Sequence, residues 1–262
     1  MLGAIIGDIV GSIYEFNNIK TKDFPLWSHG TTYTDDSIMT IAVANALMLS
    51  NGSLTEFHKH LIEQMQSLGR KYPHPCGGYG ARFSGWLFSD DPQPYNSFGN
   101  GSAMRVSACG FVANTLNEAL ALASQSAVVT HNHPEGVKGA QATVAAIFYA
   151  RNGASKEEIK EYIEQNFYTL NQSIDEIRMT YSFNETCQET VPQSIQAFLE
   201  SESFEDSIRN AISIGGDSDT LTAITGAIAE AYYGIPEDIS SKALSYLPQD
   251  LRDIVIAFEG RY

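Results

Sequence analysis

Two short acidic strings, one near each end of the chain, constrain the fold more than any other feature of the sequence. They are Thr34-Asp35-Asp36-Ser37 and Asp217-Ser218-Asp219-Thr220. Each string is followed by apolar residues at helical spacing, so a buried helix is expected to begin at both places. Carboxylates at the mouth of a buried helix are unfavourable unless something neutralises them. The N–H groups and dipole of a helix N-terminus offset only part of their charge.

Divalent metal ions would provide the missing positive charge. Both strings offer only oxygen ligands, without Cys or His, and this favours Mg²⁺, Mn²⁺ or Ca²⁺ over Zn²⁺. The alternative interpretation is simple helix capping, by Thr34 or Asp35 in the first string and by Ser218 or Asp219 in the second. Capping would account for either string alone. Because both strings carry more carboxylates than a cap requires, we favour the metal interpretation.

The composition of the chain indicates its domain organisation and limits which ligands it can attract. With 262 residues, 43 % hydrophobic and 18 % charged, the chain fits one large globular domain with a substantial core. Its formal net charge of −15 repels nucleic acid and anionic membranes, so a phosphate-bearing ligand must be received by a few local groups. The three cysteines form no metal-binding or disulfide pattern, and no apolar run is long enough to span a membrane. We therefore expect a cytoplasmic monomer that neither enters a membrane nor binds nucleic acid sequence-specifically.

Glycine recurs every fourth residue near the start of the chain, at Gly3, Gly7 and Gly11. On a helix these three share one face, where a second backbone can approach closely. Each glycine costs about 1 kcal/mol in helix propensity, so packing or access to a site should compensate. The same face continues one turn further to Glu15. A lone Glu is usually solvated surface, but this alignment makes Glu15 a candidate for a functional role.

Helix signals dominate the rest of the chain. Capping boxes begin predicted helices at Ser53, Ser155 and Ser173. Pro134 and Pro192 suit the first turn of a helix. The expected helix-terminating glycines are Gly52, Gly153 and Gly234. Alternation with a period of two is absent, so the sequence predicts a single all-α domain of about a dozen helices.

Two glycine- and proline-rich stretches, 72–80 and 90–105, interrupt the helical pattern. Such backbone can present N–H groups to a phosphate, and an aromatic neighbour such as Tyr79 or Phe98 can stack on a base. The alternative is that both are ordinary turns. Neither is a P-loop, because no Gly-Lys-Ser/Thr follows. His131 lies directly before another predicted helix, where it would assist anion binding or serve only a structural or capping role.

Six motifs occur in the order seen in ADP-ribosylglycohydrolases, and the chain resembles that family over about residues 1–235. The motifs are Gly7-Asp8-x-x-Gly11-x-x-x-Glu15, Thr34-Asp35-Asp36-Ser37, Gly78-Tyr79-Gly80, Gly99-Asn100-Gly101-x-x-Met104-Arg105, Thr130-His131-x-His133-Pro134 and Gly215-Gly216-Asp217-x-Asp219-Thr220. The resemblance implies an all-α orthogonal helical bundle, which we expect to form a single domain over residues 1–262, with a binuclear Mg²⁺ or Mn²⁺ centre. It also implies a hydrolase that cleaves the glycosidic bond between ADP-ribose and a modified acceptor (a protein side chain, a nucleic acid or a small molecule) and releases ADP-ribose.

The resemblance further implies which residues form the site. One metal ion would be held by Thr34, Asp35, Asp36 and Asp219, and the other by Glu15, Asp217, Asp219 and Thr220, with Asp219 shared. ADP-ribose would be contacted by Gly78, Tyr79, Gly80, Phe98, Gly99, Asn100, Gly101, Ser102 and His131. Glu15 and Asp36, in that order, are our candidates for the catalytic carboxylate. It would act as a general base or stabilise the oxocarbenium-like transition state.

Two other functions are considered. A relative of the crystallin J1 type would keep the fold as a catalytically silent structural or ADP-ribose-binding protein, but the complete set of acidic residues argues against it. A metal phosphatase is suggested by the string Asp217-x-Asp219-Thr220. In such enzymes that motif normally follows a strand, whereas Ile208–Ile214 is predicted to be helical here. The loop 84–96 has no clear counterpart in the family, so the acceptor stays open, as does the choice between Mg²⁺ and Mn²⁺.

Overall fold

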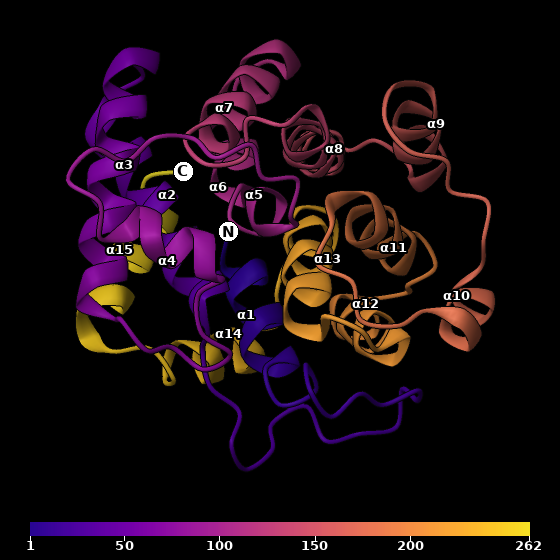
Figure 1. The fold of residues 1–262 in the computed structure, drawn as a ribbon. Helices are drawn as coiled ribbons and strands as arrows, with labels where there is room; N and C mark the ends of the chain where they lie inside the picture. Colours follow the sequence, from indigo (N-terminus) through magenta and orange to yellow (C-terminus); the bar gives the residue numbers. More distant parts are fainter.

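Fifteen α-helices and the segments between them make up the computed structural model, which describes all 262 residues (Figure 1). In chain order the helices are α1 (Leu2–Gly11), α2 (Asp35–Ser50), α3 (Leu54–Lys71), α4 (Ala81–Leu87), α5 (Gly101–Met104), α6 (Ser107–Val112), α7 (Leu116–Val128), α8 (Pro134–Arg151), α9 (Lys156–Asn166), α10 (Ile174–Thr180), α11 (Cys187–Leu199), α12 (Phe204–Ile214), α13 (Ser218–Tyr233), α14 (Glu237–Leu244) and α15 (Gln249–Glu259). No β-sheet is formed, and the only strand-like pairings are two isolated bridges, Thr34 with Cys76 and Gly99 with Thr186. The all-α prediction is confirmed. None of the helices combines the length and the apolar character needed to cross a membrane.

Two helices at the centre of the fold, α1 and α13, pack backbone against backbone (Figure 1). Gly3, Gly7 and Gly11 lie on the contact face of α1. A Cβ added at Gly7 would overlap the carbonyl oxygen of Thr222 on α13, and one at Gly3 would overlap that of Gly226. The predicted close approach at this glycine face is confirmed, and α13 is the partner.

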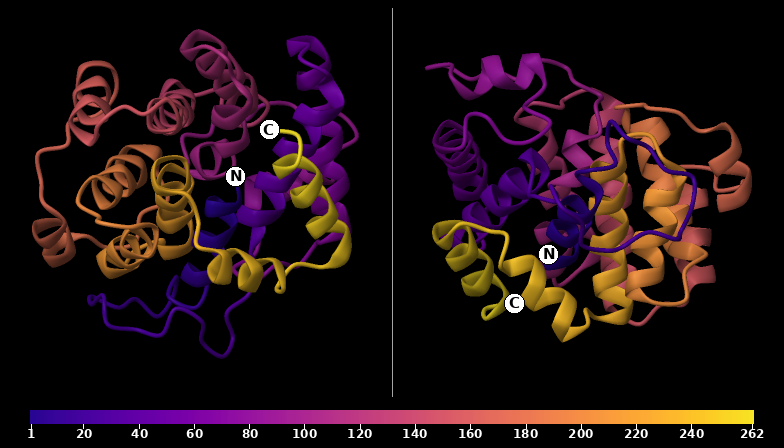
Figure 2. Two further views of the ribbon diagram at one scale, coloured as in Figure 1. Left: turned by 180° about the vertical axis from the view of Figure 1, so that it is seen from behind. Right: turned by 90° about the horizontal axis from the view of Figure 1, so that it is seen from below.

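Other helices hold this central pair from both sides (Figures 1 and 2). Helix α13 also packs on α8, α11 and α12, whereas α2 packs on α1 and is itself covered by α3 and α15. One buried hydrophobic cluster of 63 residues includes side chains from α1, α2, α8, α11, α13 and α15. Because both central helices are enclosed, the residues at their ends are held in fixed positions.

Most predicted helix ends are confirmed. Ser155 and Ser173 form complete capping boxes with the Glu three residues later. At Ser53 only half of the predicted capping box forms, because Ser53 accepts the N–H of Glu56 but the Glu56 side chain does not return a bond. Pro134 begins α8 as predicted. The helices α2, α8 and α13 are followed closely by the predicted terminating glycines Gly52, Gly153 and Gly234. Local sequence signals therefore decide where these helices begin and end.

Two local predictions are wrong. Pro192 lies inside α11 rather than in its first turn. The helix persists across the proline because neighbouring side chains such as Val191 are fully buried in the core. Helix α1 ends at Gly11 and does not continue to Glu15. The N–H of Tyr14 donates to the carbonyl of Gly11 at 2.8 Å. Glu15 is therefore positioned by this turn and not by a further turn of the helix.

The variant Gly7→Ala should destabilise the protein, although alanine favours a helix. The methyl group gains about 1 kcal/mol of helix propensity, but it overlaps the backbone of α13. That backbone cannot move away without separating the central pair. Overpacking of this kind costs about 1–3 kcal/mol or more. Because the overlap is with backbone, we take the upper end of this range and expect a net loss of about 2 kcal/mol or more in the free energy of unfolding, measured as a lower urea midpoint.

The matched control is Gly85→Ala, because Gly85 lies in α4 and a Cβ there meets nothing within 4 Å. This control should leave the urea midpoint unchanged or raise it slightly. If Gly7→Ala is as stable as the wild type, the backbones of α1 and α13 are far enough apart to admit a methyl group, and the close contact is wrong.

Candidate active site

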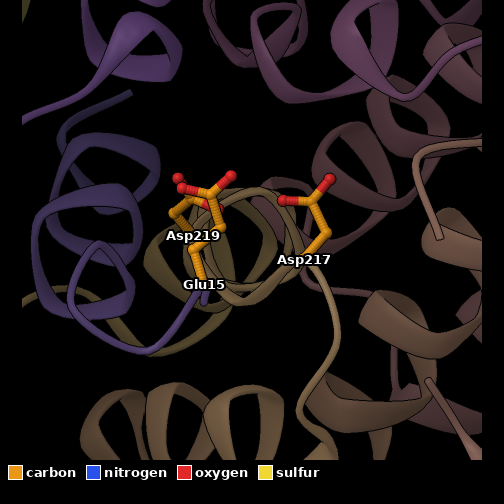
Figure 3. A group of neighbouring side chains, drawn as sticks. All are labelled: Glu15, Asp217 and Asp219. Atoms are coloured by element: carbon orange, nitrogen blue, oxygen red, sulfur yellow. The ribbon is translucent and has the colours of Figure 1, made fainter. Parts of the chain in front are cut away.

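Three carboxylates from distant parts of the chain meet where α1 ends and α13 begins. Glu15 lies in the turn after α1, Asp217 directly precedes α13, and Asp219 lies in its first turn. Each offers a carboxylate oxygen, and these three atoms lie within 4.8 Å of one another. Figure 3 shows the three side chains directed to the same side of the start of α13. The fold thus brings the second acidic string together with Glu15.

The first acidic string lies against the second. Thr220 Oγ1 donates a hydrogen bond of 2.8 Å to Asp36 Oδ2, which links the start of α13 to the start of α2. Asp36 and Asp219 are buried, and Asp35 is half-buried. All three line the same cavity as Glu15. The acidic residues that the sequence singled out therefore face one space.

Asp8 organises the start of α2, and the sequence analysis gave it no role of its own. Its completely buried carboxylate accepts hydrogen bonds from the N–H (2.9 Å) and the hydroxyl (2.6 Å) of Thr34. It also accepts from the N–H (3.1 Å) and the hydroxyl of Ser37. Burial raises the pKa of Asp8 to about 6, although these four donors favour its charged form. The available signal was a single carboxylate among the apolar residues of α1.

The capping interpretation holds for one string only. Thr34 precedes α2, and its side chain accepts the N–H of Asp36 at 3.2 Å. No side chain caps α13. The Ser218 hydroxyl donates to backbone carbonyls, and Asp217 Oδ2 accepts from Asn100 Nδ2 at 2.7 Å. Asp219 Oδ1 accepts the N–H of Thr220 at 3.0 Å within the first turn of α13, but Asp217 at the N-cap position accepts no N–H of that turn. The assignment of Thr34 as a metal ligand stays a prediction.

The protein itself does not neutralise these carboxylates. No ion pair joins any of them to Lys or Arg. Burial, followed by the charges of Asp217, Asp8 and Glu185, raises the pKa of Glu15 to about 7. Burial and neighbouring carboxylates also hold the pKa well above its usual range in Asp35, Asp36 and Asp219. A crowded donor set made only of oxygen, with no Lys or Arg paired to it, fits hard divalent ions such as Mg²⁺ or Mn²⁺.

A cavity of about 370 Å³ joins the carboxylates to the glycine-rich loops. Besides the acidic residues and Thr220, the predicted site residues that line it are Gly78, Gly80, Gly99, Asn100, Gly101 and His131. Further lining residues, none of which was predicted to belong to the site, include Arg82, Phe83, Tyr95, Glu185 and Arg105, the last residue of the fourth motif. The cavity therefore combines a group of carboxylates with glycine-rich backbone, aromatic residues and two arginines.

The predicted site residues that do not line the cavity are Thr34, Tyr79, Phe98 and Ser102. The hydroxyl of Tyr79 donates to a backbone carbonyl at 3.0 Å, and that of Ser102 donates to another at 2.7 Å. The Phe98 side chain is 45 % exposed. Phe83 and Tyr95 are aromatic residues that do line the cavity. No sequence signal marks these two residues, because they lie beside and within the loop 84–96, which matches no motif.

A buried chain of hydrogen bonds sets the protonation of His131. Arg105 is 1 % exposed, and its Nη2 donates to Thr130 Oγ1 at 2.8 Å. Thr130 Oγ1 lies 2.7 Å from His131 Nδ1, and no other acceptor is within reach of this hydroxyl. We assign the ring proton to Nε2, which lies beside Gly101, because the Thr130 hydroxyl, which already accepts from Arg105, can then donate to Nδ1. Burial, followed by the charge of Arg105, lowers the pKa of His131 well below its usual value, so the ring is a neutral donor.

Almost the entire chain matches one protein family. A sequence model of the family described as ADP-ribosylglycohydrolase matches residues 1–261. The ADP-ribosylhydrolase ARH3 of Homo sapiens is 24 % identical, over 96 % of this chain and 90 % of the relative. The ADP-ribosylarginine hydrolase Tri1 of Pseudomonas putida is 25 % identical, over 96 % of this chain and 75 % of the relative.

A solved structure shares the fold. It is described as an ADP-ribosylglycohydrolase-related protein complex, and it aligns with a TM-score of 0.68 and 21 % identity. The alignment covers 98 % of this chain and 95 % of the other. The predicted type of helical bundle is thereby confirmed.

Without metal ions, the protein should lose stability as the pH rises from about 4.5 to about 7. Glu15 keeps its proton up to a pKa of about 7 in the folded protein, whereas an unfolded chain releases it near the usual value of about 4.3–4.5. The folded state binds more protons in this window, so the free energy of unfolding falls as the pH rises. Asp8, with a pKa of about 6, acts in the same direction. Urea unfolding in EDTA at several pH values measures the slope.

The comparison variant is Glu15→Gln, because an amide does not titrate. Its stability should fall less steeply than that of the wild type over the same pH range. A wild-type stability that is constant or increases across this range would contradict the crowding of buried carboxylates.

Proposed function

The chain belongs to the ADP-ribosylglycohydrolase family, and we propose that it is a metal-dependent hydrolase that cleaves the glycosidic bond between ADP-ribose and a modified acceptor, releasing ADP-ribose. The observation that carries this proposal is the meeting of Glu15, Asp217 and Asp219 with the first acidic string at one cavity. The relatives named above are an ADP-ribosylhydrolase and an ADP-ribosylarginine hydrolase, which supports the reaction class.

We assign two ions, Mg²⁺ or Mn²⁺, to the acidic residues. One would be held by Thr34, Asp35, Asp36 and Asp219, and the other by Glu15, Asp217, Asp219 and Thr220. The hydrogen bond from Thr220 to Asp36 supports this arrangement, because it joins the two groups of ligands. When bound, the ions supply positive charge and Lewis acidity at the position of the ribose and the attacking water.

Glu15 is the carboxylate best placed to act on the reacting bond. It is half-buried at the cavity surface, whereas Asp36 is 5 % exposed and already accepts the hydroxyl of Thr220. Cleavage at the anomeric carbon develops oxocarbenium character, which a nearby carboxylate stabilises. The same carboxylate accepts a proton from the attacking water as a general base.

The loops of the cavity offer donors for a diphosphate. The N–H groups of Gly78, Gly80 and Gly101 make no hydrogen bond within the protein. His131 directs its neutral Nε2–H toward the same region as Gly101. Arg105 adds a buried positive charge that donates only to neutral oxygens. These local groups explain how a chain with a net charge of −15 would receive an anionic ligand.

Chelation with EDTA should abolish release of ADP-ribose, and Mg²⁺ or Mn²⁺ should restore it. Metal should also raise the melting temperature, because a ligand that binds only the folded state at a hundredfold excess over its Kd stabilises it by about 2.7 kcal/mol. The assay is incubation with a panel of ADP-ribosylated proteins, nucleic acids and small molecules, reading free ADP-ribose. Full activity after chelation would end the binuclear interpretation. Binding of ADP-ribose with no turnover of any substrate would favour the catalytically silent alternative.

Substitutions at Glu15 and His131 should separate turnover from binding. His131→Ala removes a hydrogen bond to a charged group, worth about 1.5–3 kcal/mol. It should therefore weaken ADP-ribose binding about ten- to a hundredfold and raise KM more than it lowers kcat. Glu15→Gln keeps the shape of the side chain but removes the base and one negative charge, so kcat should fall while ADP-ribose still binds.

Titration calorimetry with ADP-ribose and steady-state rates measure both effects. His60→Ala is the control, because His60 lies on α3 and pairs only with glutamates of its own helix. It should change neither binding nor turnover. Normal turnover by Glu15→Gln, or wild-type affinity in His131→Ala, would remove the role assigned to that residue.

A further inference from the structure

Two short segments carry carboxylates of the acidic site, and neither segment is fixed by its own sequence. Glu15 lies in the turn after α1, and Asp217 ends the connection between α12 and α13. The other residues of that connection are Gly215 and Gly216, with φ of 73° and 79°, a conformation that glycine adopts as readily as others. Figure 3 shows the two carboxylates reaching the start of α13 from these separate segments. Contacts with other parts of the chain must therefore hold both segments in place.

The side-chain amide of Asn18 joins the two segments. Its Oδ1 accepts the N–H of Gly216 at 2.7 Å, and its Nδ2 lies 2.8 Å from the carbonyl oxygen of the same residue. Nδ2 also lies 2.7 Å from the carbonyl oxygen of Tyr14 and 2.9 Å from that of Glu15. The opposite orientation of the amide would set an oxygen against three carbonyls. Apart from Asn18, only the Ser218 hydroxyl, at 3.3 Å, bonds to the backbone of Gly216.

Lys20 fixes the end of α12, where the connection starts. Its Nζ donates to the carbonyl of Tyr181 at 2.8 Å and to that of Ile214, the last residue of α12. A positive charge at this end of a helix interacts favourably with the helix dipole. A Cβ added at Gly215 would lie 3.2 Å from Lys20 Nζ and 3.3 Å from Asn18 Oδ1. Lys20 therefore holds the helix end, and Asn18 holds the connection itself.

Glu15 and Asp217 repel each other when both are ionised, as metal ligands must be. Each offers an oxygen to the group of three that lie within 4.8 Å of one another, and no Lys or Arg pairs with either. The Asp217 carboxylate accepts a hydrogen bond from Asn100, whereas the Glu15 carboxylate accepts none within the protein. The position of Glu15 therefore depends on its backbone, which Asn18 holds.

We propose that Asn18 is a positioning residue of the metal centre. By joining the backbone of Glu15 to that of Gly216, it keeps Glu15 and Asp217 together before an ion binds, and it thereby sets the affinity for the ion that they share. The inference rests on the proposed function, in which these two carboxylates belong to one set of ligands. Residues that orient metal ligands without touching the ion typically change its affinity by about ten- to a hundredfold when they are replaced.

A purely structural role of Asn18 would have a different effect. Its hydrogen bonds are exposed or only partly buried, so their loss costs little folding free energy. In the absence of metal, the same loss also lets two like charges move apart. A structural residue would lower the urea midpoint and leave metal affinity unchanged, whereas a positioning residue lowers metal affinity and changes the urea midpoint in EDTA little.

The test is calorimetric titration of the metal-free protein with Mn²⁺. The wild type should bind two ions. In Asn18→Ala the affinity for one ion should fall about tenfold or more, while that for the other changes less than about threefold. Saturating Mn²⁺ should restore most of the turnover that this variant loses at low Mn²⁺. The control Asn166→Ala removes an exposed amide that bonds only to a carbonyl of its own helix, and it should change neither affinity.

A second variant, Asn18→Asp, separates position from charge. The aspartate keeps the size of the side chain and can still accept the N–H of Gly216, but it sets a carboxylate against the carbonyls of Tyr14 and Glu15. The added negative charge alone would strengthen the binding of a cation. Weaker Mn²⁺ binding, which we expect here too, can therefore come only from displaced ligands.

Unchanged Mn²⁺ affinity in Asn18→Ala, or an equal loss for both ions, would overturn the inference, as would tighter binding in Asn18→Asp. If the wild type binds Mn²⁺ but releases ADP-ribose from no substrate, the proposed function fails, and the titration still decides the role of Asn18. If the wild type binds no Mn²⁺, the assignment of metal ions and the inference fail together.

Discussion

The backbone contact between α1 and α13 is the constraint on which the rest of the structure depends. It requires glycine on α1, because a Cβ at Gly11 would lie 2.6 Å from the Cα of Asp219. The end of α1 thus touches the residue that lies at the centre of the acidic group. The glycines that weaken α1 as an isolated helix are what allow the turn bearing Glu15 to reach the start of α13. The geometry of the site therefore depends directly on the packing of α1 against α13.

The second requirement is that carboxylates stay together although they repel one another. Asp8 keeps the carboxylates of the first string in place, because its four hydrogen bonds to Thr34 and Ser37 fix the start of α2. Asp35 and Asp36 cannot turn away while that segment is fixed. The chain folds despite this repulsion, so the oxygen donors of the proposed metal site are in position before any ion binds. Such an arrangement would lower the stability of the metal-free protein and raise its affinity for metal, as is common at functional sites.

Much of this was visible in the sequence, and the exceptions share a cause. The helix signals, the acidic strings, the glycine face and the six motifs are local patterns, and they predicted the all-α fold and many of the residues that line the cavity. What local patterns do not contain is the direction of a side chain in a loop. Tyr79 and Ser102 stand in predicted binding segments, yet their hydroxyls bond to backbone carbonyls away from the cavity. The link from Arg105 to His131 joins segments that only the tertiary fold brings together.

The long separation between α1 and α13 along the chain affects how the protein folds during its synthesis. All residues of α1 are buried in the folded protein. They emerge from the ribosome well before α13, which begins at residue 218. Contacts between such distant segments close large loops and form slowly. Until then the face of α1 that packs on α13 is uncovered, and exposed apolar surface of this kind is what chaperones bind on nascent chains. The acidic centre cannot form before residues 217–220 have been synthesised, so it assembles only after most of the chain has been made.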